Sequence, residues 1–377
     1  MPKHGILCVV GARPNFMKIA PIMQALRAGP APIPAKIVHT GQHYDAAMNK
    51  QFFEDLGIPQ PDINLDVGSG SHAVQTAEVM RRFEPVLDKE QPAAILVVGD
   101  VNSTIACALV AAKKGVAVIH VEAGLRSFDR GMPEEINRVL TDQIADLLYT
   151  TERAALANLT REGIDAARVH FVGNVMIDTL HRNLEKAIPA AQTLRDTGLD
   201  PARGYAVLTL HRPSNVDDQA TLRDLLETVN QLSQWLPVVF PLHPRTKGRI
   251  EHFKLDGLLA SGKIFTLPPI GYLHMLGLMR EAKLVLTDSG GIQEETTALG
   301  VPCLTLRNNT ERPITVDEGT NLIVGQSRAT ILAAAQEILA TGGKAGRVPE
   351  YWDGHAAERI ADHLRTWLKT QQVPVAA

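Results

Sequence analysis

The sequence predicts a doubly wound α/β protein with two similar domains, and three observations lead to that prediction. The chain has 377 residues, more than the roughly 250–300 residues that one hydrophobic core usually serves. Its short apolar runs are continuous instead of alternating, as expected of parallel strands that helices bury on both faces. The order of these runs also repeats approximately in the two halves of the chain.

The expected strands follow one another with amphipathic segments between them. In the first half they are GILCVVG, AKIVHTG, AAILVVGD and GVAVIHVE, and in the second half YAVLTLH, LPVVFPLH, KIFTLPP, KLVLTDSG and VPCLTL. Segments such as PIMQALRAG and TIACALVAAKKG have the apolar spacing of helices. The last segment predicts a packed helix, because it places on one face Ile360, Leu364, Trp367 and Leu368.

The internal repeat indicates where the two domains meet. VVGARPN (residues 9–15) resembles LTLHRPSN (208–215), and LVVGDVNST (96–104) resembles LVLTDSGG (284–291). Each half therefore has one strand that ends in a basic Arg-Pro loop and a later strand that ends in Asp before a helix. We expect the boundary near GNVMIDTL (173–180).

The composition argues against several classes of protein. The 38 basic and 41 acidic residues give a formal net charge of −3, which offers no general attraction for nucleic acid or an anionic membrane. No apolar run reaches the roughly 20 residues of a membrane helix, and the start, MPKHGILCVVGARP, lacks a signal-peptide cleavage site. Cys8, Cys107 and Cys303 lie far apart in apolar runs, which predicts buried thiols in a reducing cytoplasm.

Polar clusters follow nearly every expected strand, at the edge where open parallel sheets bind ligands. In DSGGIQEE, Ser289, Gly290 and Gly291 would present free N–H groups and the positive end of a helix to a phosphate. A tight strand-to-helix turn explains the same residues equally well. Glu294 and Glu295 either complement the helix dipole or accept hydrogen bonds from ribose hydroxyls. If the two domains face one another, these clusters line one interdomain cleft.

Four loops at strand ends, GARPNFMK, LHRPSN, PLHPRTK and TERP, carry basic side chains. A single loop of this kind is usually solvated surface, but four such loops in two domains indicate a diphosphate site. The basic residues concerned are Arg13, Lys18, His211, Arg212, His243, Arg245, Lys247 and Arg312.

The stretch HVEAGLRSFDRGMPEEINR gathers carboxylates and arginines directly after an apolar run. Pro133 suits the first turn of a helix, where Glu134 complements the dipole and can pair with Arg138. That explanation does not cover Glu122, which follows the run VAVIHV, or Asp100, which ends AAILVVGD. For Asp100 a role as the cap of the next helix is an equally good explanation. Carboxylates at two adjacent strand ends facing a third repel one another, and beside phosphate donors they indicate an acid/base centre.

Motifs for a bound cofactor are missing from the sequence. There is no G-x-G-x-x-G after the first strand, no G-x-x-x-x-G-K-[ST] and no C-x-x-C. We therefore expect neither a cofactor nor a metal, and chemistry by side chains alone.

Taken in order, nine motifs resemble those of the non-hydrolysing UDP-N-acetylglucosamine 2-epimerases: GARPNFMKIAP, TGQHYD, GDVNST, HVEAGLRSFDRGMPEEINR, GNVMIDTL, LTLHRPSN, LTDSGGIQEE, GVPCLTLR and TERPITVDEGTN. The resemblance implies a GT-B architecture of two Rossmann-like domains that flank a cleft. The N-terminal domain would comprise residues 1–172 and a helix in 354–377 that crosses back, and the UDP-binding domain residues 173–353. It also implies a cytoplasmic homodimer whose partner is a UDP-sugar.

Members of this family interconvert UDP-GlcNAc and UDP-ManNAc, which are precursors of cell-surface polysaccharides. They eliminate UDP to give 2-acetamidoglucal and add it back after C2 is reprotonated from the other face, since the C2 proton is not next to a carbonyl. By motif, the catalytic carboxylates are Asp100, Glu122 and Glu134. His211 completes the expected catalytic set and would grip the diphosphate with Arg13. The expected substrate-binding residues are Arg13, Lys18, Arg138, Ser289, Gly290, Gly291, Glu295 (at the ribose) and Arg312.

Two departures from the family pattern limit what the resemblance implies. Pro213 and Ser214 stand where many bacterial members have a second Arg and a Glu, and LDVGSG (65–70) lacks a nearby arginine. In those members such residues help to form a second UDP-GlcNAc site that activates the enzyme, so we expect no such activation here. The departures leave room for a modified sugar such as a diacetamido uronic acid. Further alternatives are a hydrolysing 2-epimerase, a GT-B glycosyltransferase and a catalytically silent nucleotide-sugar sensor.

Overall fold

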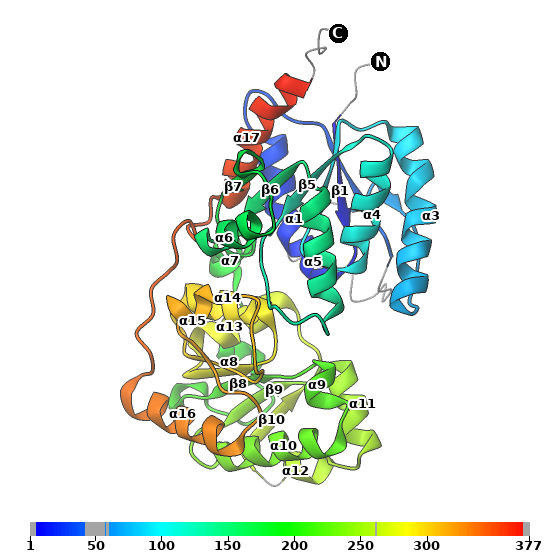
Figure 1. Ribbon diagram of the computed structural model, residues 1–377. Coiled ribbons are helices and arrows are strands. Elements are labelled where there is room, and N and C mark those ends of the chain that lie inside the picture. Colours follow the sequence, from blue (N-terminus) through cyan, green and yellow to red (C-terminus); the bar gives the residue numbers. More distant parts are fainter. Residues whose placement is uncertain (1–4, 42–56, 58–59, 261, 372–377) are drawn as a thin grey trace, which may run out of the picture. The chain divides into compact units, whose positions relative to one another are not determined.

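The computed structural model describes residues 5–41, 57, 60–260 and 262–371, and the chain divides into two compact units (Figure 1). Unit 1 is Met1–Arg182 with Glu350–Ala377, and unit 2 is Asn183–Pro349. The first boundary lies ten residues after the one expected from the sequence (182 against 172), and the second four residues before it (349 against 353). Most of the TGQHYD motif lies outside the described residues.

Unit 1 contains a parallel sheet of seven strands in the order β3-β2-β1-β4-β5-β6-β7. The direction of winding reverses between β1 and β4, whose carboxyl ends therefore form the switch point at which doubly wound sheets bind ligands. The strands are β1 (Ile6–Val10), β2 (Ala35–His39), β3 (Ile63–Asn64), β4 (Ala94–Val98), β5 (Ala117–Val121), β6 (Leu147–Thr150) and β7 (Val169–Phe171).

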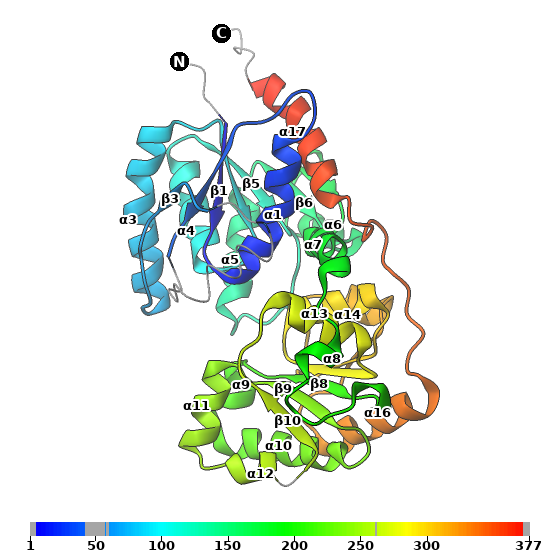
Figure 2. The ribbon, with the colours of Figure 1, turned by 180° about the vertical axis from the view of Figure 1, so that it is seen from behind.

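Helices cover both faces of this sheet. Figure 1 shows α3, α4 and α5 on one face, and Figure 2 shows α1 and α17 on the other. Val79 and Phe83 of α3 share one buried core with Leu7 and Ile95 of the strands, which is why the strands read as continuous apolar runs. The helices of unit 1 are α1 (Arg13–Arg27), α3 (His72–Glu90), α4 (Asn102–Lys113), α5 (Pro133–Ile144), α6 (Arg153–Arg161), the 3-10 helix η1 (Ala166–Arg168), α7 (Val175–Asn183) and α17 (Ala356–Gln371).

The terminal helix α17 returns to unit 1 and packs there through the face expected from the sequence. Its Ile360 and Leu364 are fully buried. Asp178 of α7 accepts hydrogen bonds from the first backbone N–H groups of this helix, those of Ala356 (3.1 Å) and Ala357 (2.7 Å). A carboxylate at this end also complements the helix dipole, so sequence-distant segments of unit 1 are joined at the start of α17.

Unit 2 repeats the same winding with six parallel strands in the order β10-β9-β8-β11-β12-β13. Its switch point lies between β8 and β11. The strands are β8 (Ala206–Thr209), β9 (Val238–Pro241), β10 (Ile264–Leu267), β11 (Leu284–Thr287), β12 (Cys303–Thr305) and β13 (Asn321–Ile323). The doubly wound α/β class with two Rossmann-like sheets, which is the GT-B pair of folds, is thereby confirmed.

The helices of unit 2 connect and cover these strands. They are η2 (Leu184–Lys186), α8 (Ala190–Thr193), η3 (Pro201–Arg203), α9 (Pro213–Val216), α10 (Gln219–Ser233), α11 (Pro244–His252), α12 (Asp256–Ala260), α13 (Tyr272–Glu281), α14 (Gly290–Leu299), α15 (Ile314–Asp317) and α16 (Arg328–Thr341). Within the described part of the chain, no helix is long and apolar enough to cross a membrane.

Candidate active site

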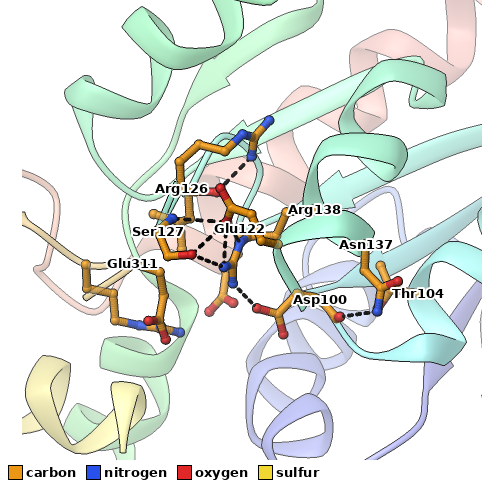
Figure 3. Close-up of polar contacts among 12 residues, drawn as sticks. Asp100, Thr104, Glu122, Arg126, Ser127, Asn137, Arg138 and Glu311 are labelled. Atoms are coloured by element: carbon orange, nitrogen blue, oxygen red, sulfur yellow. Dashed lines mark hydrogen bonds and ion pairs between the residues drawn. The ribbon is translucent and has the colours of Figure 1, made fainter. Parts of the chain in front are cut away.

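Asp100 lies just beyond β4 and is held by α5. Its carboxylate pairs with the guanidinium of Arg138, and its backbone oxygen accepts a hydrogen bond of 2.8 Å from Asn137 (Figure 3). The preceding Gly99 has a φ of +68°, and a Cβ there would lie 3.3 Å from the amine of Lys18. Glycine thus allows both the left-handed turn into Asp100 and the approach of the lysine.

Glu122 follows β5 and is almost fully buried. Its side chain is 2% exposed, and its Oε2 lies 2.5 Å from Nζ of Lys18, itself buried on α1. Its Oε1 has no hydrogen-bond partner among the described residues. The φ of Glu122 is +69°, a conformation that costs a non-glycine residue on the order of 1–2 kcal/mol and that concentrates at functional sites. Lys18 therefore holds one carboxylate oxygen, and the other is buried without a hydrogen-bond partner among the described residues.

The start of α5 carries Glu134 and Glu135. Glu134 is half-buried in the first turn. Glu135 accepts hydrogen bonds from the backbone N–H groups of Ser127 (3.0 Å) and Phe128 (2.9 Å) and pairs with Arg138 at 2.7 Å. Burial raises the pKa of Glu135, but the hydrogen bonds from Ser127 and Arg138 outweigh it and hold the pKa below its ordinary value. Glu135 is thus a structural anion that fixes the loop before α5.

These contacts change the expected electrostatics of unit 1. We expected the strand-end carboxylates to repel one another. In the structure each of them pairs with a cation, Asp100 with Arg138 and Glu122 with Lys18. The structure therefore brings four of the expected residues together in two ion pairs. Arg13 begins α1, but its side chain lies outside those described.

In unit 2, His211 follows β8 and is anchored by Asp288, which follows β11. Nδ1 of His211 lies 2.9 Å from Oδ1 of Asp288. The same carboxylate accepts hydrogen bonds from the backbone N–H groups of His211 (3.0 Å) and Arg212 (2.9 Å) and from Asn215 (3.1 Å). Burial raises the pKa of Asp288, yet the His211 contacts outweigh it and lower that pKa. The His211 side chain is 35% exposed, so its ring is oriented by Asp288 while remaining accessible.

The residues Ser289, Gly290 and Gly291 form the start of α14, as expected. A Cβ on Gly290 would come within 2.5 Å of the Arg312 guanidinium and 2.7 Å of Glu311, so the close approach of this arginine requires glycine. Arg312 is itself tied to Glu311 at 2.6 Å and to Glu294 at 2.9 Å. The expected cation at this helix start is therefore present, and two buried carboxylates hold it there.

Glu295, the expected ribose-binding residue, is buried on α14. Tyr272 donates a hydrogen bond of 2.8 Å to its Oε1. Burial raises the pKa of Glu295 to about 7, with a further rise from the neighbouring Glu294, although the Tyr272 hydrogen bond opposes the change.

In the loop PLHPRTK the ring centroid of His243 lies 5.5 Å from that of His211, whereas Arg245 and Lys247 make contacts with acidic neighbours. Arg245 pairs with Asp217, and Lys247 lies 3.8 Å from Glu251, all four side chains being well exposed or nearly so. These contacts are those of an ordinary solvated surface.

Sequence reasoning missed several residues that organise the site: Glu135, Asp288, Glu311 and Tyr272. Asp288 has a signal, because it directly follows a buried strand. Glu311 adjoins Arg312 within the basic motif TERP. Tyr272 has no such signal, since it meets Glu295 from a separate helix.

Comparisons with known proteins identify the chain. Two doubly wound parallel sheets with ionisable groups at both switch points define a protein of the GT-B fold class. A family model described as UDP-N-acetylglucosamine 2-epimerase matches residues 25–365. The chain belongs to the UDP-N-acetylglucosamine 2-epimerase family, and it is an epimerase by that membership. The family resemblance expected from the motifs is thus confirmed.

Two relatives and one solved structure illustrate the range of the family. The UDP-N-acetylglucosamine 2-epimerase of Methanocaldococcus jannaschii is 43% identical over 358 residues, 93% of this chain and 96% of the relative. A Pseudomonas aeruginosa protein named UDP-2,3-diacetamido-2,3-dideoxy-D-glucuronate 2-epimerase is 42% identical over 95% of this chain and 99% of its own length. A crystal structure of the M. jannaschii UDP-GlcNAc 2-epimerase with UDP-GlcNAc and UDP matches with a TM-score of 0.87, 42% identity and coverage of 96% and 99%.

Proposed function

We propose that the protein is a non-hydrolysing UDP-GlcNAc 2-epimerase, which interconverts UDP-GlcNAc and UDP-ManNAc. The observation that carries this proposal is the buried Glu122 carboxylate, one oxygen of which is held by Lys18 while the other has no partner among the described residues. Such a group can act as a general base toward a substrate carbon without a cofactor.

The proposed reaction has two steps. A carboxylate takes the C2 proton, the C1–O bond breaks with its electron pair going to the β-phosphate oxygen of UDP, and a C1=C2 double bond forms. In the second step C2 is protonated from the opposite face, and the same UDP oxygen attacks C1. We assign the acid/base roles to Asp100, Glu122 and Glu134 as a group.

The leaving diphosphate needs donors that act as its charge develops. We propose that His211, Arg13 and Arg312 supply these donors together with the α14 start, where the backbone N–H groups of Gly290 and Gly291 would meet a phosphate. Ser289 precedes them, and its own N–H donates to Oγ1 of Thr287 at 2.9 Å. The anchoring of His211 by Asp288 supports its role, because the ring is oriented before any ligand binds. Glu295 would accept hydrogen bonds from the ribose, and Lys18 and Arg138 would hold the carboxylates.

The test is proton NMR of the purified protein with UDP-GlcNAc in D2O. The proposal expects UDP-ManNAc with deuterium at C2 in the sugar pool. Free ManNAc and UDP would instead establish a hydrolysing 2-epimerase. Sugar transfer that depends on an added acceptor would establish a GT-B glycosyltransferase.

A second candidate substrate is a diacetamido uronic acid linked to UDP, because a relative with that name is 42% identical to this chain. The same NMR experiment with that sugar distinguishes the two substrates. Turnover of the uronate with none of UDP-GlcNAc would replace the first proposal and keep the elimination chemistry. Binding of both sugars without turnover of either would leave a nucleotide-sugar sensor.

Three further properties belong to this proposal. We expect hyperbolic kinetics, because Pro213 and Ser214 replace the residues that accompany substrate activation in the family, and strongly sigmoidal kinetics would contradict this. We place the enzyme in the cytoplasm as a supplier of polysaccharide precursors, in keeping with its buried free cysteines. We also propose a homodimer, which light scattering would test, and the exposed Ile136 (41%) and Leu140 (49%) on one face of α5 offer it an apolar surface.

A further inference from the structure

A cluster of four ionisable side chains in unit 1 is not used by the chemistry proposed above. It consists of His120 in β5, Asp142 on α5, Arg126 in the loop between them and Glu162 at the end of α6, and it is called here the His120 cluster. The side chains of His120 and Asp142 are 0% exposed. Buried ion pairs need good geometry to offset the cost of desolvating their charges. The question is therefore which contacts stabilise this cluster and what it does for the fold.

Both ring nitrogens of His120 meet hydrogen-bond acceptors. Nδ1 lies 2.6 Å from Oδ1 of Asp142, and Nε2 lies 2.9 Å from the backbone oxygen of Gly99. A carbonyl oxygen and a carboxylate can only accept, so each ring nitrogen must donate a proton. His120 is therefore an imidazolium cation in this arrangement.

The second oxygen of Asp142 is also fully used. It accepts a hydrogen bond of 3.0 Å from the backbone N–H of Gly124 and lies 2.7 Å from Arg126. Arg126 in turn pairs with Glu162 at 2.6 Å. Burial raises the pKa of Asp142, but the charge of His120 and then that of Arg126 outweigh it and lower this pKa. With two cations and two anions the cluster has no net charge, which lowers the desolvation cost of burying it.

The two backbone groups that the cluster binds are the neighbours of the proposed catalytic carboxylates. Gly99 immediately precedes Asp100, and Gly124 lies two residues after Glu122. Both glycines have positive φ, +68° and +77°, so neither segment is part of a regular strand that would define its position. The N–H of Gly99 donates to the oxygen of Val121 (3.1 Å), and the oxygen of Gly124 accepts from Asn158 (3.0 Å). The bonds to His120 and Asp142 add a link from each segment to one shared cluster.

We propose that His120 and Asp142 are positioning residues that set the separation of Asp100 and Glu122 by tying Gly99 and Gly124 to one buried charge cluster. Neither side chain contacts substrate in this role. The inference deepens the proposed epimerase function and rests on it, because a displacement of about 1 Å in either carboxylate costs on the order of 100-fold in rate.

Two substitutions of His120 test its two hydrogen bonds one at a time. In His120→Asn the amide can donate from near the position of Nδ1 to Asp142, and in His120→Gln from near Nε2 to Gly99. We expect each variant to lose 10- to 100-fold in kcat, in keeping with the cost of such a displacement, with KM and the Kd of UDP within about two-fold of the wild type. His363→Gln is the matched control, since it removes the 2.7 Å bond between His363 of α17 and Tyr149 within β6. It should lower the melting temperature and leave kcat unchanged.

A spectroscopic measurement tests the cluster without reference to activity. The ¹⁵N spectrum of the full-length protein at pH 7 should contain one histidine with two protonated ring nitrogens that is absent from His120→Gln. Should the His120 variants fail to fold, Glu162→Gln, at the more exposed end of the cluster, is expected to keep the fold and lower kcat several-fold.

Three results would overturn the inference. They are a neutral imidazole signal assigned to His120, a kcat of His120→Asn and His120→Gln within two-fold of the wild type, or an equal loss of kcat in His363→Gln. If the wild type epimerises no UDP-sugar while the doubly protonated histidine is observed, the proposed function is refuted. The arrangement of charges in the His120 cluster is then still supported.

Discussion

The two units wind their sheets in the same way, but the surroundings of two buried carboxylates, Asp288 in unit 2 and Glu122 in unit 1, differ. In unit 2, Asp288 accepts hydrogen bonds from two backbone N–H groups and from Asn215 while it pairs with His211. In unit 1, Glu122 has one cation, Lys18, and an oxygen with no partner among the described residues. Asp288 is thus occupied in holding His211 in place, whereas one buried oxygen of Glu122 has no hydrogen-bond partner within the described part of the chain.

The comparison teaches that a carboxylate at a strand end is not by itself a catalytic residue. Asp100 and Asp288 both follow a parallel strand near a switch point. What distinguishes them is the number of donors that the surrounding chain supplies. We expect substitutions in unit 1 to act on the rate and substitutions in unit 2 to act on UDP binding.

The largest effect is expected at the unit 1 carboxylates. Glu122→Gln, Asp100→Asn and Glu134→Gln should each lower kcat by about 1000-fold, within the range for loss of a general acid or base. Isothermal titration should show the Kd of UDP unchanged within two-fold, because no UDP-binding group of unit 2 is altered. Near-normal rates in all three variants would refute the assignment of the acid/base roles.

The next effect concerns the stability of the fold and its dependence on pH. The pKa of Glu295 is raised from 4.5 to about 7, so between these values the folded state holds a proton that the unfolded chain releases. The contribution of this group to the free energy of unfolding therefore falls by about 3 kcal/mol as pH rises through that window. Above the window it no longer changes with pH.

Glu295→Gln removes this dependence. We expect the difference in free energy of unfolding between the variant and the wild type, measured by denaturation, to shift by about 2–3 kcal/mol in favour of the variant from pH 5 to pH 8. Glu251→Gln, on an exposed part of α11, is the control and should differ from the wild type by less than about 0.5 kcal/mol at both pH values. Parallel pH profiles for the wild type and Glu295→Gln would show that Glu295 is ionised throughout.

The smallest of the three effects is expected at Asp288. Asp288→Asn removes the negative charge that orients His211, which should weaken UDP binding by about 10- to 30-fold, the equivalent of roughly 2 kcal/mol for a charged hydrogen bond. Asp178→Asn is a matched control in unit 1, because Asp178 is also buried and accepts two backbone hydrogen bonds. It should cost stability and leave the Kd of UDP unchanged. Equal losses of UDP binding in both variants would remove the distinction between the units.

The sequence by itself determined the fold class, because continuous apolar runs are a local property. Each expected run contains a strand of the structure, from β1 to β12. The strands it did not predict are β3, β6, β7 and β13, which have only two to four residues each, and three of these lie at sheet edges. Short edge strands bury little, so their apolar signal is weak.

The sequence also placed the polar motifs correctly at the carboxyl ends of strands, since parallel winding brings those ends to one edge. Only the tertiary structure decided the partners. Lys18 meets Glu122 across 104 residues of chain, Arg138 meets Asp100 across 38, and Asp288 binds the His211 backbone across 77. Such pairings depend on the register and depth of separate elements, which local spacing does not encode. For the same reason the sequence could name the ionisable groups of the site, whereas their ion-pair and hydrogen-bond partners followed from packing.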